Sequence, residues 1–318
     1  MNKNFNDLLK SYKNRRIAVA VSGGIDSMAL MHIAANSGLN AVAVTVDHGL
    51  RENSASDAKF VEQIAAKIKI PHYILHWTGT KPKTGIEDAA RRARYELLLD
   101  FCRAHDIKVL MTAHQADDQI ETFLMNLGRG SGVYGLAGIR AELTLDGITI
   151  ARPLLDVTRA ELIKYCKNNK IEYVHDEMND DENFTRVKIR KNRHILEDRL
   201  GITDARILTA IHSLGRVRDM LEDDVEELVS SVLINNRAIF SEKFLTDMPH
   251  ELRMKFLSRI LQKIGTLPYP PRLEKIERAI ICLENDCKFT TARCIVRRVQ
   301  SNILIAAEGQ SCSFRKAK

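Results

Sequence analysis

The sequence predicts an α/β protein: a doubly wound, Rossmann-like parallel sheet, followed by a smaller and mostly helical domain that ends in a β-hairpin. Two observations support this fold class. Over the first half of the chain, short apolar runs alternate with amphipathic helical segments, as in a parallel sheet covered on both faces. The second half has mainly helical periodicity and closes with two short apolar strands. The 318 residues suffice for two domains, which we expect at 1–200 and 201–318.

Each element follows from its local pattern. Strands are expected at residues 17–21, 41–46, 73–77 and 108–112, and helices between and after them at 27–35, 54–68, 86–105 and 115–127. A Thr-x-x-Glu capping box begins a helix at Thr158 that extends to about residue 169. The later elements are an acidic loop at 176–182, a basic helix at 184–200, a long helix from 203, helices at 251–264 and 272–283, and a hairpin of 292–299 and 302–307 with its turn at 300–301.

Composition and charge exclude several classes of protein. No apolar run approaches the length of a membrane span, and the first residues lack the apolar core of a signal peptide, so we expect a cytoplasmic protein without membrane contact. The six cysteines form no C-x-x-C pair, a spacing typical of reduced core thiols and not of a zinc site. The formal net charge is +7, and residues 251–318 carry 14 Lys and Arg against 6 Asp and Glu. This basic end favours a polyanionic partner, although a solvated surface would also explain it.

The segment Ser22-Gly23-Gly24-Ile25-Asp26-Ser27 joins the first strand to the first helix. Glycines allow the backbone to approach a ligand closely, Ser27 is a suitable helix cap, and the helix N-terminus attracts phosphate. Asp26 would repel a phosphate unless Mg²⁺ or a bound ammonium lay between them. The segment therefore predicts a site for a nucleotide whose pyrophosphate is released, against the alternative of an ordinary Ser-Gly-Gly turn.

A second group of polar residues follows the fourth strand. His114 precedes Asp117, Asp118 and Glu121, and the three carboxylates lie on one face of a helix. They can hold Mg²⁺ through water or bind a cationic amine. The alternative is that the acids only complement the helix dipole. Because this helix starts at the same edge of the sheet as the glycine loop, we favour the binding role.

Two further segments remain ambiguous by themselves. Glu87, Arg91, Arg94 and Tyr95 share one helix, where the arginines either face phosphate or form ordinary ion pairs along the helix. Asp47-His48 follows the second strand, and we expect it near the base or ribose of the nucleotide.

Together these motifs resemble the PP-loop ATP pyrophosphatases and, within that group, the tRNA(Ile)-lysidine synthetases. Besides the segments above, the resemblance includes Arg129-Gly130-Ser131-Gly132, Arg152-Pro153-Leu154-Leu155 and Asp176…Asn179…Arg186…Arg190, and it covers roughly residues 15–195. The sequence departs from the family where Gln115 replaces a second histidine, where Met178 replaces a small hydroxyl residue, and where Val187 replaces an asparagine.

The resemblance implies an ATP-dependent ligase for tRNA modification. In this reaction the wobble cytidine of a tRNA(Ile) with a CAU anticodon is adenylated at its C2 oxygen, free L-lysine then attacks C2, and lysidine, AMP and pyrophosphate result. The implied cofactors are ATP and Mg²⁺, and the implied partners are the tRNA and lysine; a homodimer is an open alternative to a monomer.

The resemblance also assigns site residues. The catalytic set is Asp26, Asp117, Asp118, Glu121 and His114, with Asp26 and Asp118 as magnesium ligands. The ATP-binding set is Ser22, Gly23, Gly24, Ile25, Asp26, Ser27, Asp47 and His48. The substrate and tRNA set is Arg91, Arg94, Tyr95, Arg129, Arg152, Asn179, Arg186, Lys188 and Arg190.

Three other functions stay open on the sequence. A tRNA thiolase would also adenylate a base, but it needs a sulfur-carrying thiol. A ligase acting on a small metabolite leaves the basic end unexplained. A non-catalytic protein that binds tRNA or nucleotide would not need the carboxylate of Asp26.

Overall fold

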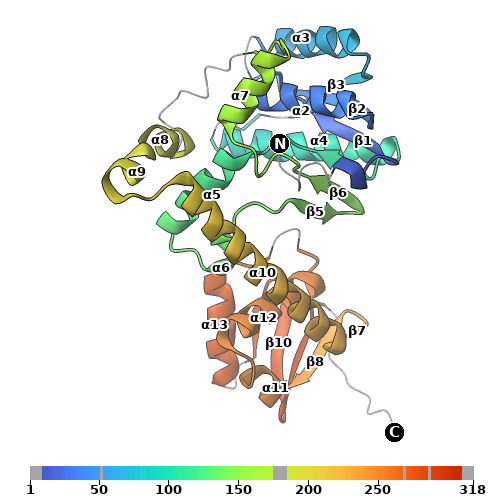
Figure 1. Ribbon diagram of the computed structural model, residues 1–318. Coiled ribbons are helices and arrows are strands. Elements are labelled where there is room, and N and C mark those ends of the chain that lie inside the picture. Colours follow the sequence, from blue (N-terminus) through green and yellow to red (C-terminus); the bar gives the residue numbers. More distant parts are fainter. Residues whose placement is uncertain are drawn as a thin grey trace. The chain divides into compact units, whose positions relative to one another are not determined.

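The computed structural model describes residues 9–50, 53–79, 81–82, 84–174, 185–267, 270–285 and 288–309 (Figure 1). The chain divides into two compact units, residues 1–215 and 216–318. This division lies within the long helix α10 (Asp204–Val232), later than the border near residue 200 that we expected from the sequence. The expected acidic loop at 176–182 lies outside the described residues.

The first unit contains a six-stranded sheet in the order β3-β2-β1-β4-β6-β5. Its strands are β1 (Arg16–Ala20), β2 (Asn40–Asp47), β3 (His72–His76), β4 (Val109–Met111), β5 (Glu142–Leu145) and β6 (Ile148–Ala151). Neighbouring strands are parallel except for β5, which runs antiparallel to β6. The four predicted strands and their parallel arrangement are confirmed.

We did not predict β5 and β6 from the sequence. Asp146 and Gly147, which join them, both have positive φ values of 49° and 76°. An Asp-Gly pair between two short alternating runs is a strong hairpin signal, so this hairpin is encoded locally in the sequence. The hairpin matters because it extends the sheet by one parallel and one antiparallel strand.

The helices of the first unit cover both faces of the sheet (Figure 1). They are α2 (Ile25–Asn36), α3 (Ser54–Lys67), α4 (Ile86–Ala104), α5 (Ala116–Gly128), α6 (Val133–Leu136), α7 (Arg159–Asn168), α8 (Thr185–Asn192) and α9 (His194–Leu200). Ile17 and Val19 of β1 share a core with α2, α3 and α7, whereas Ala18 between them packs on the α4 side. This alternation of side chains is what a buried strand requires.

Two helix predictions needed adjustment. The basic helix expected at 184–200 is divided into α8 and α9 at Arg193. The first helix begins at Ile25 with Gly24 as its N-cap, so the prediction that Ser27 caps it is wrong. Helix α10 (Asp204–Val232) is continuous over 29 residues, as the periodicity predicted.

The second unit is built around a five-stranded antiparallel sheet in the order β7-β8-β11-β10-β9. Its elements are β7 (Leu233–Ile234), β8 (Arg237–Ser241), α11 (Glu242–Thr246), α12 (His250–Ile264), α13 (Leu273–Glu284), β9 (Phe289–Thr291), β10 (Cys294–Val299) and β11 (Asn302–Ala307). The predicted hairpin is present as β10 and β11. Its first strand starts later than expected, because Ala292 and Arg293 form a turn with positive φ.

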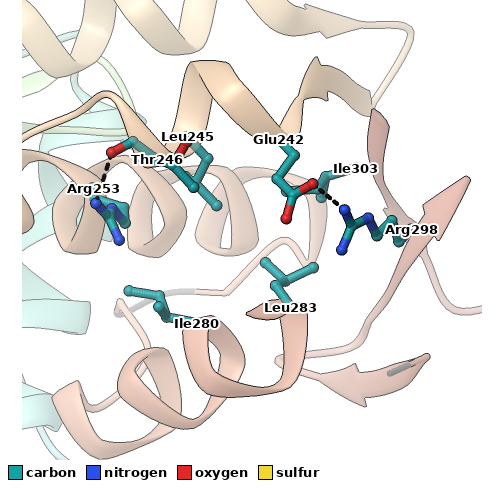
Figure 2. Close-up of a pocket in the computed structure, with 8 residues that line it drawn as sticks. All are labelled: Glu242, Leu245, Thr246, Arg253, Ile280, Leu283, Arg298 and Ile303. Atoms are coloured by element: carbon teal, nitrogen blue, oxygen red, sulfur yellow. Dashed lines mark hydrogen bonds and ion pairs between the residues drawn. The ribbon is translucent and has the colours of Figure 1, made fainter. Parts of the chain in front are cut away.

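A small pocket of the second unit is too narrow for a substrate. Leu245, Ile280, Leu283 and Ile303 supply its apolar wall, and Glu242 pairs with Arg298 at one end (Figure 2). At the other end Arg253 donates a hydrogen bond of 3.0 Å to the carbonyl of Thr246. The volume of about 20 Å³ holds no more than a water molecule. No helix among the described residues is both long and apolar enough to span a membrane.

Candidate active site

The glycine loop lies between the end of β1 and the start of α2, as the sequence predicted. The Ser27 hydroxyl organises it: its Oγ accepts a hydrogen bond of 3.1 Å from the Ser22 N–H and donates one of 2.9 Å to the Gly24 carbonyl. The first N–H groups of any helix have no partner within the helix, and here they belong to residues that follow Gly24. The loop therefore presents main-chain donors at the positive end of a helix dipole, which suits a phosphate.

Gly23 has a φ of +88°, a conformation that side chains rarely adopt. Its carbonyl accepts a hydrogen bond of 2.9 Å from the Val174 N–H, so the segment after α7 holds the loop in place through its main chain. This requirement for glycine is a physical reason for the Ser-Gly-Gly pattern.

Asp26 is partly buried at the start of α2, and its Oδ1 is a buried oxygen without a hydrogen-bond partner among the described residues. Burial raises the pKa of this carboxyl to about 6, although the Arg159 guanidinium lowers it; the carboxylates of Asp118 and Asp117 raise it further. An unpartnered carboxylate oxygen beside a phosphate loop is a chemically suitable ligand for a hard cation.

Helix α5 begins with a reciprocal capping box. The Gln115 side chain accepts a hydrogen bond of 2.7 Å from the Asp117 N–H, and the Asp118 carboxylate accepts one of 3.0 Å from the Gln115 N–H. Gln115, which departs from the family pattern, thus serves as the helix cap. We expected Asp26 and the carboxylates of α5 to lie at the same edge of the sheet. The negative charges of Asp117 and Asp118 both raise the pKa of Asp26, as groups near one another do.

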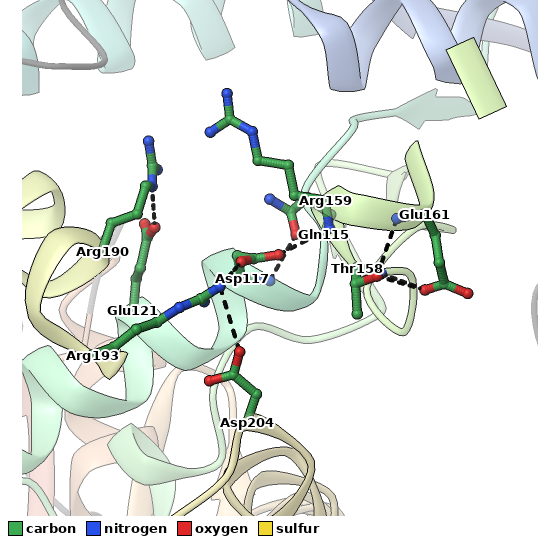
Figure 3. A network of polar contacts seen from close by, with 9 residues as sticks. All are labelled: Gln115, Asp117, Glu121, Thr158, Arg159, Glu161, Arg190, Arg193 and Asp204. Atoms are coloured by element: carbon green, nitrogen blue, oxygen red, sulfur yellow. Dashed lines mark hydrogen bonds and ion pairs between the residues drawn. The ribbon is translucent and has the colours of Figure 1, made fainter. Parts of the chain in front are cut away.

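The three carboxylates of α5 are each paired with an arginine of the α8–α9 segment. Glu121 accepts a hydrogen bond of 2.8 Å from the Nε of Arg190. Asp118 lies 3.5 Å from Arg186. Asp117 pairs with Arg193, which also lies 3.4 Å from Asp204 (Figure 3). We refer to these three contacts as the α5–α8 ion pairs.

This finding changes the interpretation of two residues. The resemblance assigned Arg186 and Arg190 to tRNA phosphates, but both have carboxylate partners inside the protein. Lys188, between them, is exposed, and a phosphate role for it stays a prediction. Arg193 was missed; its spacing from Arg186 and Arg190 matches one helix face and could have indicated a shared set of partners.

Glu121 is the most deeply buried of these acids, with an exposed fraction of 0%. Burial raises its pKa, and the hydrogen bond and charge of Arg190 oppose that shift. Its second oxygen, Oε2, is buried without a hydrogen-bond partner among the described residues. That oxygen therefore has an unused acceptor position inside the protein.

His114 is held in its neutral form. Burial and the positive charges of Arg152, Arg91, Arg94 and Arg186 lower its pKa to about 3. Its Nδ1 lies 2.9 Å from the Thr112 hydroxyl. His114 can therefore donate or accept a hydrogen bond near neutral pH but cannot supply a positive charge.

The remaining predicted residues have the following positions. Arg91 stacks over the Tyr95 ring at 5.2 Å on α4, and the buried Arg152 donates a hydrogen bond of 2.8 Å to the Arg140 carbonyl. Asp47 ends β2, the neighbour of β1, and accepts a hydrogen bond of 2.9 Å from the Gly49 N–H. The other positions are as follows: His48 accepts a hydrogen bond from the Leu50 N–H, Arg94 is exposed on α4, Arg129 is exposed after α5, and Asn179 lies outside the described residues.

No cluster of three or more metal-ligating side chains occurs in the described part of the chain. Magnesium bound to a nucleotide needs only one or two carboxylates, because phosphates and water complete its shell. Asp26 fits this role through its unpartnered oxygen. Asp118 fits it less well, because its two oxygens already contact Arg186 and the Gln115 N–H.

The burial of Glu121 leads to a stability prediction. Arg190→Ala leaves a buried carboxylate without its cation, so we expect a loss of about 3 kcal/mol in the free energy of unfolding. Arg186→Ala breaks a longer, more exposed pair, and the expected loss is under about 1 kcal/mol. Urea unfolding followed by the fluorescence of Trp77, the single tryptophan, measures both. Equal losses in the two variants would contradict the special role of the buried acid, and Glu121→Gln should restore part of the stability lost in Arg190→Ala.

Asp26 leads to a prediction about pH. Its folded-state pKa of about 6 exceeds the ordinary 3.8, so the folded chain keeps a proton that the unfolded chain has lost between these values. Stability therefore falls as the pH rises through that window. Asp26→Asn removes this titration and should stabilise the protein by about 1–2 kcal/mol at pH 8, with no difference below about pH 4. Thermal unfolding in EDTA measures the effect; a variant less stable than the parent at pH 8 would refute it.

Comparison with known proteins identifies the family. Residues 1–196 match the family model of the PP-loop domain. A tRNA(Ile)-lysidine synthase of Rhodopseudomonas palustris is 39% identical over 274 residues, covering 82% of this chain and 78% of the relative. A tRNA(Ile)-lysidine synthase of Wolbachia pipientis wMel is 32% identical over 309 residues, covering 94% of this chain and 72% of the relative.

One solved structure adds support for the fold alone. The U34-tRNA thiolase NcsA from Methanococcus maripaludis, with its 4Fe–4S cluster, matches with a TM-score of 0.56 at 16% identity, covering 67% of this chain and 79% of that one. The glycine loop at the end of β1, the acids of α5 and the extended matches lead to one conclusion: this chain belongs to the tRNA(Ile)-lysidine synthase family of PP-loop proteins.

Proposed function

We propose that the protein ligates free L-lysine to C2 of the wobble cytidine of a tRNA(Ile) with a CAU anticodon, at the expense of ATP. The observation that carries the proposal is the similarity to tRNA(Ile)-lysidine synthases over most of the chain. The site supplies a phosphate loop and buried carboxylates at the carboxyl ends of parallel strands, where ligands bind in such sheets. We also propose that the enzyme acts in the cytoplasm, where a tRNA substrate would be available to it.

The first step joins AMP to the base. The C2 oxygen of cytidine attacks the α-phosphorus of ATP, the bond to the β-phosphate oxygen breaks, and pyrophosphate leaves. Main-chain N–H groups of the Ser22–Ser27 loop bind the departing pyrophosphate. Neutral His114, at the end of β4, can hydrogen-bond the base or its flanking phosphate without adding charge.

The second step replaces AMP by lysine. The ε-amine attacks C2, the bond from C2 to its oxygen breaks, and AMP leaves with that oxygen. The attacking amine must lose a proton, and a carboxylate with a raised pKa is suited to take it. We assign this role to Glu121, whose Oε2 is buried and without a partner. Asp117, with both oxygens in internal contacts, positions the neighbouring helices instead of binding lysine.

Magnesium is the cation that this site fits. Asp26 would supply a ligand through its unpartnered Oδ1. When bound, the ion offsets negative charge on the phosphates.

A tRNA thiolase is the nearest competing function. Burial raises the pKa of the Cys102, Cys166 and Cys294 thiols to about 11, so these three are poor nucleophiles. The cysteines within the described residues form no metal-binding cluster. These observations favour lysine ligation over sulfur transfer.

The decisive experiment combines the purified protein with ATP, Mg²⁺, lysine and tRNA carrying a CAU anticodon. We expect AMP, pyrophosphate and a tRNA that is heavier by one lysine less one water, measured by mass spectrometry. Without lysine, pyrophosphate should be released and an adenylated tRNA should remain. Asp26→Asn should give neither product. Sulfur incorporation, or AMP release that is independent of lysine, would reject the proposal.

We also propose that the second unit, 216–318, binds tRNA. A groove of about 550 Å³ in this unit is lined by Leu267, Pro270, Pro271, Arg272, Lys275, Ala292 and Arg293. Its three cations have no ion pair among the described residues, in contrast to Arg259 and Lys263, which pair with acids of α10. An uncompensated basic groove is a suitable surface for a phosphate backbone.

This role predicts a defined salt dependence. Lys275→Ala should weaken tRNA binding roughly fivefold and reduce the slope of log Kd against log salt by about 1, because one phosphate contact is lost. Lys243→Ala, another exposed helical lysine of the same unit, is the matched control and should leave both values unchanged. Fluorescence anisotropy with labelled tRNA at several salt concentrations measures them. Equal slopes for the two variants would exclude the groove.

A further inference from the structure

Arg159 is a cation beside the glycine loop to which neither the motifs nor the resemblance assigned a role. It is the first residue of α7, directly after the cap Thr158, whose hydroxyl accepts a hydrogen bond of 3.2 Å from the Glu161 N–H. Its own N–H donates a hydrogen bond of 2.9 Å to Oδ2 of Asp117 (Figure 3). The backbone at Arg159 is therefore fixed from both the α7 and the α5 side.

Helix α7 is also fixed against the loop. Leu162 and Cys166 share a core with Met28 of α2, and the Cys166 thiol lies 3.9 Å from the Ile25 carbonyl. Six residues after α7 ends, the Val174 N–H binds the Gly23 carbonyl. The position of the Arg159 backbone relative to Asp26 is thus set by packing on both sides.

The guanidinium of Arg159 has no carboxylate partner in the described part of the chain. In Figure 3 its side chain extends away from Asp117, while Arg190 and Arg193 point at their acids. It is nevertheless close enough to Asp26 that its positive charge lowers the pKa of that carboxyl more than the charge of Arg190 does. The buried Oδ1 of Asp26 in turn has no hydrogen-bond partner.

Two opposite charges therefore lie near each other without forming an ion pair, beside main-chain donors of a helix N-terminus. In a folded protein such charges usually pair, as the α5–α8 ion pairs do. A ligand that carries negative charge and also brings a cation would satisfy the guanidinium of Arg159, the carboxylate of Asp26 and the main-chain N–H groups together. A magnesium-bound polyphosphate is such a ligand, and a guanidinium matches the geometry of its oxygens.

We propose that Arg159 binds non-bridging oxygens of the β- and γ-phosphates of ATP and holds pyrophosphate as it leaves. This inference rests on the proposed function and adds a phosphate-binding residue to it. Because the contact is to the leaving group, AMP binding does not depend on it.

Titration calorimetry with ATP, pyrophosphate and AMP, each with Mg²⁺, tests the assignment. Arg159→Ala should weaken ATP and pyrophosphate binding about 10- to 100-fold, as expected for a hydrogen-bonded charge pair, and leave AMP binding unchanged. Arg159→Lys should recover part of the loss, since it keeps the charge but not the bidentate geometry. Lys164→Ala, which removes an exposed cation from the same helix, is the control and should not alter any of the three.

The outcomes separate this inference from the proposed function. The backbone hydrogen bond to Asp117 survives in Arg159→Ala, and an unchanged melting temperature would verify that the fold is intact. If the parent protein makes lysidine and Arg159→Ala binds pyrophosphate as tightly as the parent, the inference is wrong and the function stands. Equal weakening of AMP would place Arg159 at the α-phosphate and overturn the assignment. A parent protein that binds ATP but makes no lysidine would contradict only the function.

Discussion

The buried carboxylate of Glu121 constrains the whole catalytic unit, because a charge removed from water must be compensated. Arg190 supplies that compensation, and Arg186 and Arg193 do the same for Asp118 and Asp117. Through these contacts α8 and α9 are held against α5, and Arg193 also ties α5 to the start of α10. Chain segments far apart in the sequence are thereby brought together by three acids on one helical turn.

Because a buried charge needs a partner, the structure distinguishes two kinds of charged side chain. Some are paired within the protein, and others have no ion-pair partner and are available to a ligand. Basic residues with acidic partners contribute to the architecture. The charge of Arg159 acts on Asp26 without an ion pair between them, and Asp26 lies at the start of α2, next to a loop of main-chain donors. We propose the ATP phosphate site on the basis of this contrast and not of the number of basic residues, and the same reasoning favours the uncompensated groove of the second unit for tRNA.

Much of the fold and part of the site could be predicted from the sequence. The alternation of strands and helices, the glycine loop, the acids of α5 and the hairpin at the end of the second unit depend on local patterns, and local patterns are visible in a sequence. The five-stranded sheet of the second unit was not predicted. Strands β7 and β9 have only 2 and 3 residues, and β8 joins the sheet through non-local pairing with β11. The Asp146-Gly147 hairpin was overlooked even though its turn signal is local.

By itself, the sequence determined where a phosphate loop can form and which residues can carry charge. Gly23 has a positive φ that residues with side chains rarely adopt, and the strand before it is an apolar run that is buried. Both the glycine and the apolar run are features of short segments, so they can be recognised in the sequence. Only the tertiary structure decided which charges are compensated. Arg159 and Arg190 are indistinguishable as residue types, yet Arg190 pairs with a buried glutamate, whereas Arg159 acts on the carboxyl of Asp26 only through its charge. The physical reason is that the energy of a charge depends on its three-dimensional surroundings, which residues distant in the chain supply.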